Sequence, residues 1–363
     1  MSLTSGLVLP RTGRKIRNRM VLAAMTNKQS FDDGTLSDEE INWLLRRAEG
    51  GFGIITTAAS HVSQCGKSWE GEMGVWGDHQ LRKLTELASG IRQRGSIGLV
   101  QIFHGGLRAP RSLTSKQPVS ASINLEKGVE EESRELSDSE IENLIQDFGN
   151  AAKRCEQAGF EGVEIHGAHG YLISQFLGKK TNRRKDRWGG ELIDRSLFLR
   201  KIVECVRKNT SEEFLICVRI SPEHDVGITI DESLGLSELL VEMNIDILHI
   251  SCWDIFSSAS DDLDSKRTIT RRFSEILQNR IPLLTTGSIW NEEDGDFALS
   301  EGADLVGVAR VAIAHPDWAN KIGKSDYSPI KPPFTPEHLM DVELSPIFID
   351  YMRRWKGFVT DGK

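Results

Sequence analysis

Residues 137–171, SDSEIENLIQDFGNAAKRCEQAGFEGVEIHGAHGY, contain the repeating unit from which the fold is predicted. The unit opens with Ser137 and Glu140 in the Ser-x-x-Glu spacing of a capping box, which predicts a helix over residues 137–158. Ala158-Gly159-Phe160 is typical of a helix C-cap that leads into a strand, and the apolar run at 162–165 predicts that strand. Two histidines and a tyrosine follow it directly.

The same alternation of short apolar runs and amphipathic stretches extends through most of the chain. Eight strands are expected near residues 20–24, 53–57, 97–102, 162–165, 214–220, 245–250, 281–285 and 303–308. The helices expected between them cover residues 37–49, 78–94, 137–158, 194–208, 232–243, 270–278 and 291–300. Strands that alternate with helices indicate a parallel α/β sheet. Eight repeats favour a closed (β/α)8 TIM barrel, with an open doubly wound sheet as the alternative.

Two segments fall outside this alternation. Residues 105–136 form a polar insertion after the third strand, and we expect a loop or small hairpin over the barrel mouth. Residues 324–346 are proline-rich and suggest a tail that crosses the surface or meets another subunit. We therefore predict a single domain, with a barrel at 1–322 and a C-terminal extension at 323–363 that packs on the barrel or on a neighbouring subunit.

Composition excludes several classes of function. The 363 residues carry a formal net charge of −8, which argues against a nucleic-acid binder. The five cysteines are odd in number and lack Cys-x-x-Cys spacing, so we expect a reducing compartment and no disulfide framework. No apolar run approaches the roughly 20 residues of a membrane span, and residues 1–10 do not resemble a secretory signal. A cytoplasmic protein without a membrane partner is the expectation.

A cluster of three aromatic side chains follows the fourth predicted strand, where barrel enzymes place catalytic groups. Neutral imidazoles of His166 and His169 can donate hydrogen bonds to a carbonyl oxygen. The phenol of Tyr171 has an ordinary pKa of about 10 and can deliver its proton. A metal site and a purely structural role for the histidines are the alternatives. No cysteine or carboxylate at metal-ligand spacing accompanies the pair, so we expect no metal ion.

Three further features are expected to face a ligand at the same end of the barrel. Gly287-Ser288 and Gly307-Val308-Ala309-Arg310 follow the last two strands, where barrels often bind phosphate through backbone N–H groups. Ordinary turn glycines are the alternative interpretation. Arg219 lies within an apolar strand and must be paired in a buried salt bridge or face a ligand.

These residues together resemble the Old Yellow Enzyme family of flavin oxidoreductases over roughly residues 5–320. The motifs that carry the resemblance are NRMVLAAMT (18–26), QIFHGG (101–106), EIHGAHGYL (164–172) and NRRKDRWGG (182–190), followed by VR (218–219), TGS (286–288) and GVAR (307–310). The second and third blocks contain the residues expected to carry the chemistry. We expect the block at 182–190 to shape and cap a loop.

The resemblance implies an FMN-dependent ene-reductase. Non-covalent FMN would lie at the barrel mouth, where NADH or NADPH reduces it before an electron-poor alkene such as an enone or a nitroalkene enters. His166 and His169 would bind the activating oxygen, flavin N5 would give hydride to the β-carbon, and Tyr171 would protonate the α-carbon. By the same resemblance Thr26 would bond the flavin O4, Gln101 and Arg219 would hold the pyrimidine edge, and Gly287, Ser288, Gly307 and Arg310 would hold the phosphate. The implied cofactor-binding set is completed by Ala24, Met25, Ala58, His166 and Ala309.

Some points stay open at this stage. Thr26 replaces the cysteine of the thermophilic-like branch of the family, so redox behaviour cannot be copied from that branch. Arg353 or Arg354 would reach a neighbouring active site if the chain forms a homo-oligomer of that branch's kind. Trp69, Trp253 and Phe256 are candidates for the substrate pocket, with packing as the alternative. A non-flavin barrel lyase or isomerase acting on a phosphorylated metabolite, and a non-catalytic barrel, are the competing functions.

Overall fold

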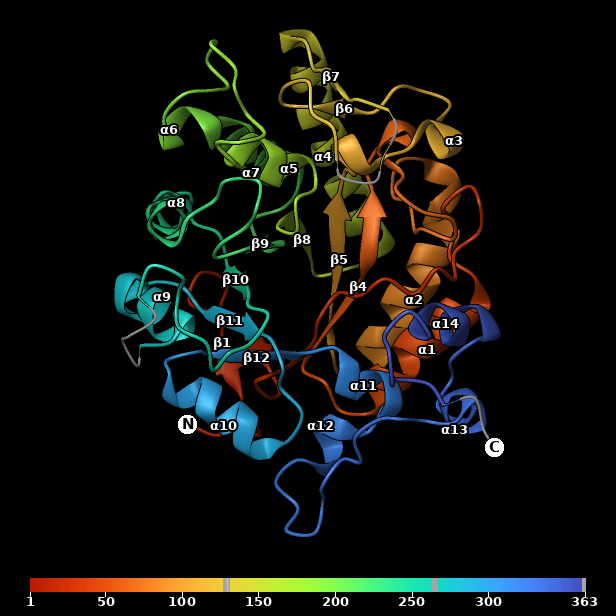
Figure 1. The fold of residues 1–363 in the computed structure, drawn as a ribbon. Helices are drawn as coiled ribbons and strands as arrows, with labels where there is room; N and C mark the ends of the chain where they lie inside the picture. Colours follow the sequence, from red (N-terminus) through yellow and green to blue (C-terminus); the bar gives the residue numbers. More distant parts are fainter. Residues whose placement is uncertain (127–128, 130, 263–266, 361–363) are drawn as a thin grey trace.

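The chain forms a closed parallel barrel surrounded by helices (Figure 1). The computed structural model describes residues 1–126, 129, 131–262 and 267–360. The barrel strands are β3 (Met20–Leu22), β4 (Ile54–His61), β5 (Ile97–Phe103), β8 (Gly162–Gly167), β9 (Leu215–Ile220), β10 (Ile247–Ser251), β11 (Leu283–Thr286) and β12 (Leu305–Val308). They pair in the order β10-β11-β12-β3-β4-β5-β8-β9, and the circle closes between β9 and β10. The predicted (β/α)8 barrel is confirmed, and the open sheet is wrong.

The observed elements follow the predicted ones closely. Each strand lies within two residues of its predicted ends, except that β4 continues to His61. The helices that follow the strands are α1 (Asp38–Glu49), α2 (Leu81–Gln93), α4 (Asp138–Ala158), α7 (Leu197–Asn209), α8 (Ile230–Glu242), α9 (Ile269–Leu277), α10 (Glu292–Ser300) and α11 (Arg310–Ala314). β4 contains a register shift between Thr56 and Ala59, a β-bulge in the middle of the strand.

The two predicted capping boxes differ in the structure. At α4 the box is complete, because Ser137 accepts from the Glu140 backbone N–H and the Glu140 carboxylate accepts from the Ser137 N–H. At α1 only half of the box forms: Ser37 accepts from the Glu40 N–H, but the Glu40 carboxylate is buried and accepts from Asn27 and Ser30 instead. Gly159 ends α4 with φ 97°, the left-handed conformation that a C-cap glycine favours.

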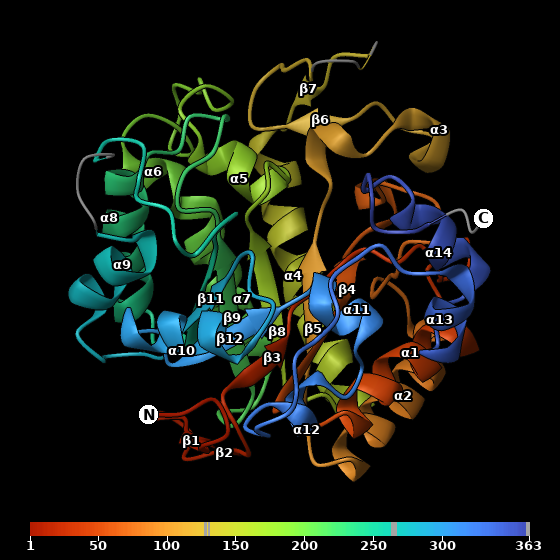
Figure 2. The same ribbon diagram turned by 60° about the horizontal axis from the view of Figure 1, so that its bottom comes forward.

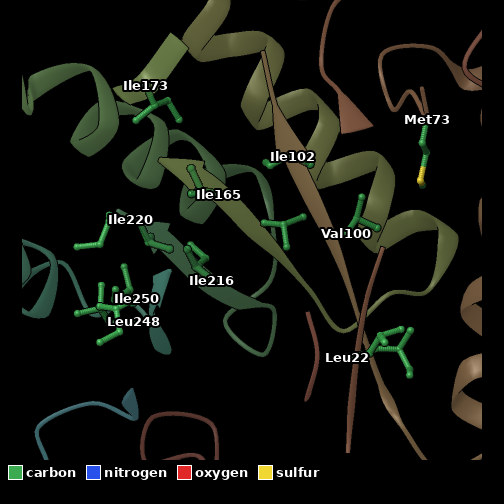
Figure 3. Packing of buried hydrophobic residues seen from close by; sticks show 14 of the residues in the cluster. Leu22, Met73, Val100, Ile102, Ile165, Ile173, Ile216, Ile220, Leu248 and Ile250 are labelled. Atoms are coloured by element: carbon green, nitrogen blue, oxygen red, sulfur yellow. The ribbon is translucent and has the colours of Figure 1, made fainter. Parts of the chain in front are cut away.

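Alternation along the strands separates two hydrophobic layers. Residues that point outward, such as Val100, Ile102 and Ile165, form the layer between barrel and helices shown in Figure 3. Residues that point inward form a second cluster inside the barrel. Ile16 of the short antiparallel pair β1 (Leu7–Val8) and β2 (Lys15–Ile16) joins this cluster, as does Leu9 directly after β1. Figure 2 shows this pair at the end of the barrel opposite the insertion. The amino end of the barrel is therefore filled with apolar side chains.

The insertion after β5 lies beyond the arrowheads of β4 and β5, at the carboxyl end of the barrel (Figure 1). It contains η3 (Gly106–Arg108), α3 (Arg111–Thr114), β6 (Val119–Ser120) and β7 (Arg134–Glu135). The expected hairpin is wrong in detail, because β6 and β7 pair in parallel rather than antiparallel. The block at 182–190 supports this insertion, since Arg184 donates to the carbonyl oxygens of Ala121 and Leu136.

The C-terminal segment contacts the barrel of its own chain through α1. It contains α13 (Pro336–Asp341) and α14 (Pro346–Met352), and the Phe348 ring meets Trp43 at a centroid distance of 5.4 Å. The buried Arg47 guanidinium donates to the carbonyl oxygens of Val342 in this segment and of Ala312 and Ile313 in α11. In the part of the chain that the structure describes, no helix has the length and apolar character needed to span a membrane.

Candidate active site

The inward-facing side chains change character along each strand. In β9, Leu215 and Cys217 belong to the interior apolar cluster, and Arg219 follows them on the same face. In β10, Ile247 is followed by His249 on the same face. The strand register then places Gln101 beside Glu164, His166 beside Arg219, and Arg219 beside His249. Polar side chains from four neighbouring strands therefore converge at the carboxyl half of the barrel.

The three predicted catalytic rings lie together. The centroids of His166 and His169 are 4.9 Å apart with planes at 89°, and those of His166 and Tyr171 are 5.1 Å apart. His166 is in β8, His169 lies in the following turn, and Tyr171 is the N-cap residue of α5 (Leu172–Leu177). The structure thus brings all three side chains to one place, as the sequence predicts.

The turn that carries His169 is held in an unusual backbone conformation. His169 has φ 63°, in the left-handed region that non-glycine residues rarely adopt. Its N–H donates to the Ser221 Oγ at 3.0 Å, and its carbonyl oxygen accepts from Arg108 Nη1 at 2.7 Å. The buried Gln175 amide donates to the Gly170 carbonyl oxygen at 2.8 Å. These contacts fix where the His169 ring points.

The proton of His166 has a definite position. Burial, with the nearby charge of Arg219 as a second cause, holds its pKa well below the ordinary value, so the ring is neutral. Its Nδ1 accepts from the Ala168 backbone N–H at 3.2 Å. A neutral imidazole whose Nδ1 is an acceptor carries its proton on Nε2. His166 is therefore a fixed Nε2–H donor.

His169 is neutral for the same reasons and is linked to Arg219 through a serine. Burial, followed by the charge of Arg219, lowers the pKa of His169 well below its ordinary value. The His169 Nε2 lies 2.8 Å from the Ser251 Oγ, and Arg219 Nη2 donates to the same oxygen at 3.0 Å. Ser251 thus joins the histidine pair to the buried arginine.

The Tyr171 ring packs against other aromatic side chains. Its ring lies 5.1 Å from Phe103 and 6.2 Å from Trp69, and Arg108 from the insertion lies 5.5 Å above it. Burial raises the pKa of the Tyr171 phenol to about 12, although the Arg108 charge acts in the opposite direction. The phenol therefore keeps its proton at neutral pH. The buried Glu72 carboxylate holds the turn that carries Trp69 by accepting from the Ser68 N–H at 2.9 Å.

A buried network lies deeper in the barrel. Gln101 Nε2 donates to Glu164 Oε1 at 2.6 Å, and His249 Nδ1 lies 2.6 Å from Glu164 Oε2. His249 Nε2 lies 3.2 Å from the Thr286 Oγ1. Although burial alone would raise it, the pKa of Glu164 falls to about 2, because His249, Arg219 and Gln101 favour the carboxylate. Burial lowers the pKa of His249 and keeps that ring neutral.

This network also contains a group with metal-ligand chemistry. Among the described residues, ligand atoms of Glu164, Cys217 and His249 lie within 4.8 Å of one another. Both carboxylate oxygens of Glu164 are already occupied by the donors of Gln101 and His249. Burial also raises the pKa of the Cys217 thiol well above its ordinary value, which opposes the thiolate that a metal requires. The trio is a hydrogen-bonded cluster.

Two polar atoms above this network have no partner among the described residues and fit the edge of a planar cofactor. Arg219 is buried, yet its Nε has no hydrogen-bond partner among the described residues, and its Nη1 makes only a 3.4 Å contact to the Ala24 carbonyl oxygen. Gln101 Oε1 likewise has no protein donor in the described part of the chain. Ala58 lies in the β4 bulge, and its carbonyl oxygen accepts from Thr57 and Ser60. The donor and acceptor pair suits the pyrimidine edge of FMN, which offers carbonyl oxygens and an N–H.

In the loops after β11 and β12, close backbone packing requires glycine at positions 287 and 307. A Cβ at Gly307 would lie 2.2 Å from Thr286 Cγ2, and one at Gly287, which has φ 147°, would lie 2.4 Å from the Cys252 carbonyl oxygen. Thr286 pairs with Gly307 and with Ser251, and the Ser251 Oγ lies 2.8 Å from the His169 Nε2. Arg310 begins α11, is exposed, and has no ion pair among the described residues. This free guanidinium fits a phosphate, whereas the Ser288 hydroxyl donates to the Trp253 carbonyl oxygen.

The remaining candidates divide between the site and the surface. Thr26 and Met25 are half-buried directly after β3, and Ala309 is the N-cap residue of α11. Trp253 is 86% exposed, and Phe256 packs against Phe297 at 4.8 Å, so packing and exposure describe these two better than a pocket role. The exposed Arg354 stacks on Tyr351 of α14 at 5.1 Å.

Comparison with known proteins decides the family. The family model described as NADH:flavin oxidoreductase / NADH oxidase matches residues 12–328. The chain belongs to this family, which includes Old Yellow Enzyme. The enzyme is an FMN-dependent oxidoreductase that uses NADH or NADPH, and the alternatives of a non-flavin lyase and a non-catalytic barrel are wrong.

Similar proteins extend this result. The enzyme is 36% identical over 318 residues to the probable NADH-dependent flavin oxidoreductase YqiG of Bacillus subtilis (strain 168), covering 86% of this chain and 85% of the relative. It is 33% identical to an NADH:acrylate oxidoreductase of Vibrio harveyi, of which it spans 32%. The structure of an Old Yellow Enzyme homologue from Zymomonas mobilis matches its fold with TM-score 0.81 at 24% identity, covering 94% of this chain and 99% of that one.

Several residues of this oxidoreductase site were not predicted from the sequence. Glu164 and His249 are charged or titratable residues within apolar strands, and period-two counting from Arg219 and His166 would have placed both inside the barrel. Arg108 and Ser251 depend on how a loop and a strand end meet the turn at His169. No local pattern in the sequence indicates those contacts.

Proposed function

We propose that the protein is an ene-reductase that uses NADH or NADPH to reduce an electron-poor alkene, such as an enone or a nitroalkene. The observation that carries the proposal is the meeting of two neutral imidazoles and a protonated phenol above Gln101 and Arg219. When bound at these residues, FMN would supply the hydride chemistry that connects the nicotinamide with the β-carbon of the alkene.

FMN binding is assigned to residues that have unused hydrogen-bonding capacity within the described part of the chain. Gln101 Oε1 would accept from the pyrimidine N–H, and the Arg219 guanidinium would donate to the neighbouring carbonyl. Arg310 and the backbone of the loops at Gly287, Ser288, Gly307 and Ala309 would hold the phosphate, while Ala24, Met25, Thr26 and Ala58 would border the ring system. A cation at the pyrimidine edge opposes the negative charge that reduction adds.

Substrate activation is assigned to the histidine pair. The Nε2–H of His166 donates to the carbonyl or nitro oxygen of the alkene, and His169 binds the same oxygen. Because both rings are neutral, they bind the oxygen without transferring a full proton to it. Donors held in place by the backbone of residues 167–171 stabilise the charge that develops on that oxygen.

Tyr171 completes the reduction by protonating the α-carbon. Its buried phenol keeps the proton until the α-carbon becomes basic, and the rings of Phe103 and Trp69 pack beside the phenol ring. General acid catalysis of this type contributes roughly 100-fold to 10,000-fold to a rate.

Turnover of an alkene panel tests the proposal. Purified protein is mixed with FMN, with NADH or NADPH, and with an enone, a nitroalkene or acrylate, and both nicotinamide oxidation and the saturated product are measured. We expect stoichiometric saturated product from at least one activated alkene. Nicotinamide oxidation that consumes only oxygen, with no saturated product from any alkene, would contradict the proposal while leaving the family intact.

A further inference from the structure

We propose that Glu164 and His249 are positioning residues that set which end of the Gln101 amide faces the cofactor and that offset the charge of Arg219. The inference rests on the proposed function, because it takes the FMN pyrimidine edge to lie against Gln101 and Arg219. It concerns a layer of side chains below those that touch the cofactor.

The orientation of Gln101 follows from its partner. A side-chain amide offers either a donor group or an acceptor oxygen on each side. Glu164 is a carboxylate and accepts only, so it takes the NH2 group of Gln101 at 2.6 Å. The Gln101 Oε1 is therefore turned toward the cofactor position as an acceptor. An acceptor is what the pyrimidine N–H requires.

His249 fixes the charge on Glu164. Its Nδ1 lies 2.6 Å from Glu164 Oε2, and its Nε2 lies 3.2 Å from the Thr286 hydroxyl. Because Glu164 is ionised, the neutral ring must carry its proton on Nδ1, where it donates to the carboxylate, and Nε2 accepts from Thr286. Both oxygens of Glu164 then have a donor, which keeps a buried carboxylate stable without a direct ion pair.

The carboxylate also acts on Arg219 through space. Arg219 pairs in register with His166 and His249, and Glu164 favours its charged form. Two buried opposite charges in one barrel layer leave little net charge beneath the cofactor. Loss of the negative charge would leave Arg219 uncompensated, which makes addition of electrons to the bound cofactor easier.

Glu164→Gln should change both the orientation of the Gln101 amide and the negative charge that offsets Arg219. His249 would donate to the new amide oxygen, so the new NH2 group would point at Gln101. Gln101 would have to turn its Oε1 inward and present its NH2 group to the pyrimidine N–H, donor against donor. We expect FMN to bind roughly tenfold to a hundredfold more weakly, the cost of one mismatched buried hydrogen bond, and the reduction potential of bound FMN to become more positive.

A pair of variants at His249 tests the hydrogen bond from His249 to Glu164 without substituting Glu164 itself. His249→Asn keeps a donor near the position of Nδ1, whereas His249→Leu removes it. FMN dissociation constants are measured by fluorescence titration and potentials by spectroelectrochemistry. We expect the asparagine variant to stay within about threefold of the wild-type FMN affinity and the leucine variant to bind roughly tenfold more weakly.

Asp246→Asn is the matched control, because Asp246 is a buried carboxylate bound by Arg11 and Arg207 just before β10, at the amino end of the barrel. It should lower the thermal midpoint and leave FMN affinity and potential unchanged. Wild-type affinity and potential in folded Glu164→Gln, or equal affinities for the two His249 variants, would overturn the inference. Failure of the wild type to bind FMN would instead overturn the proposed site.

Discussion

The amino and carboxyl halves of the barrel interior are built on the same strands but use opposite chemistry. At the amino end, Val21, Ile54 and Leu215 are completely buried among apolar neighbours, and Leu9 and Ile16 close the base. Further along the same faces of β9 and β10, Arg219 follows Leu215 after four residues and His249 follows Ile247 after two. In both halves, alternate residues of a strand face the barrel interior. Position along the strand then decides whether such a side chain stabilises the fold or carries chemistry.

The two halves should respond differently to substitution. Side chains at the amino end have all their packing partners within the protein, so their loss costs stability. At the carboxyl end, Gln101 Oε1 and Arg219 Nε have no hydrogen-bond partner among the described residues, which fits the cofactor site proposed above. Variants in the two halves should separate stability from binding and catalysis.

Tyr171→Phe at the carboxyl end should have the largest effect. Removal of the phenol should lower alkene reduction by about 100-fold or more, because the α-carbon loses its proton donor. Reduction of bound FMN by NAD(P)H should survive, since that half-reaction transfers hydride without this proton. Stopped-flow measurement of both half-reactions checks this, and an equal loss of both would refute the proton-donor role.

Leu215→Ala at the amino end should have a large effect of the other kind. Leu215 is fully buried in the interior cluster, and truncation should lower the free energy of unfolding by about 2–5 kcal/mol. FMN affinity of the folded variant should stay at the wild-type value. Denaturant unfolding and fluorescence titration measure the two quantities. A variant of full stability but weak FMN binding would break the division between the halves.

Acid sensitivity should come from the carboxyl end, where the buried histidines lie. The pKa of His104 falls to about 4 and that of His61 to about 3, both because burial disfavours the charged ring. The folded protein then stays neutral at these rings while the unfolded chain takes up protons below about pH 6.5. Stability should be complete above that pH and fall as the pH drops toward 4. The same direction holds for His166, His169 and His249.

His104→Asn removes one of the histidines that take up a proton on unfolding, and so measures its share of the acid sensitivity. The asparagine oxygen can still accept from the Gly106 N–H, as His104 Nδ1 does at 3.0 Å. The slope of unfolding free energy against pH near pH 5 should decrease by about 1.4 kcal/mol per pH unit, the contribution of one proton. Glu40 and Glu72 act in the opposite sense, because burial raises their pKa values, and they are present in both proteins. An unchanged slope would contradict the assignment.

Arg310→Ala should have the smallest effect and tests the phosphate position. The variant should bind FMN about tenfold more weakly, because one charge-assisted contact is lost. Riboflavin, which has no phosphate, should bind the variant and the wild type equally. Parallel titrations with the two flavins measure this. A similar loss for both flavins would place Arg310 away from the phosphate.

The sequence predicts the barrel well because its signals are local. Caps at Ser137 and Gly159 and the apolar run at 162–165 that follows them are sufficient to place α4 and β8. The rings of His166, His169 and Tyr171 could be predicted to meet because they follow one strand within six residues. The parallel pairing of β6 and β7 and the half-formed box at Ser37 depend on tertiary partners, which local spacing does not contain.

The deeper layer of the site was missed for a different reason. Glu164 looks like part of a strand motif, and His249 has no motif around it, so neither stands out until strand register sets them 2.6 Å apart. The bulge at Ala58 likewise has no glycine or proline to indicate it. Strand pairing, rather than side-chain type, creates these features.

The most direct test of the account is a crystal structure of the protein with FMN. The account predicts the pyrimidine edge of the ring system within hydrogen-bonding distance of Gln101 Oε1 and Arg219, with His166, His169 and Tyr171 beside its reactive nitrogen. FMN bound elsewhere, or a ring system whose reactive nitrogen is remote from those three side chains, would contradict it.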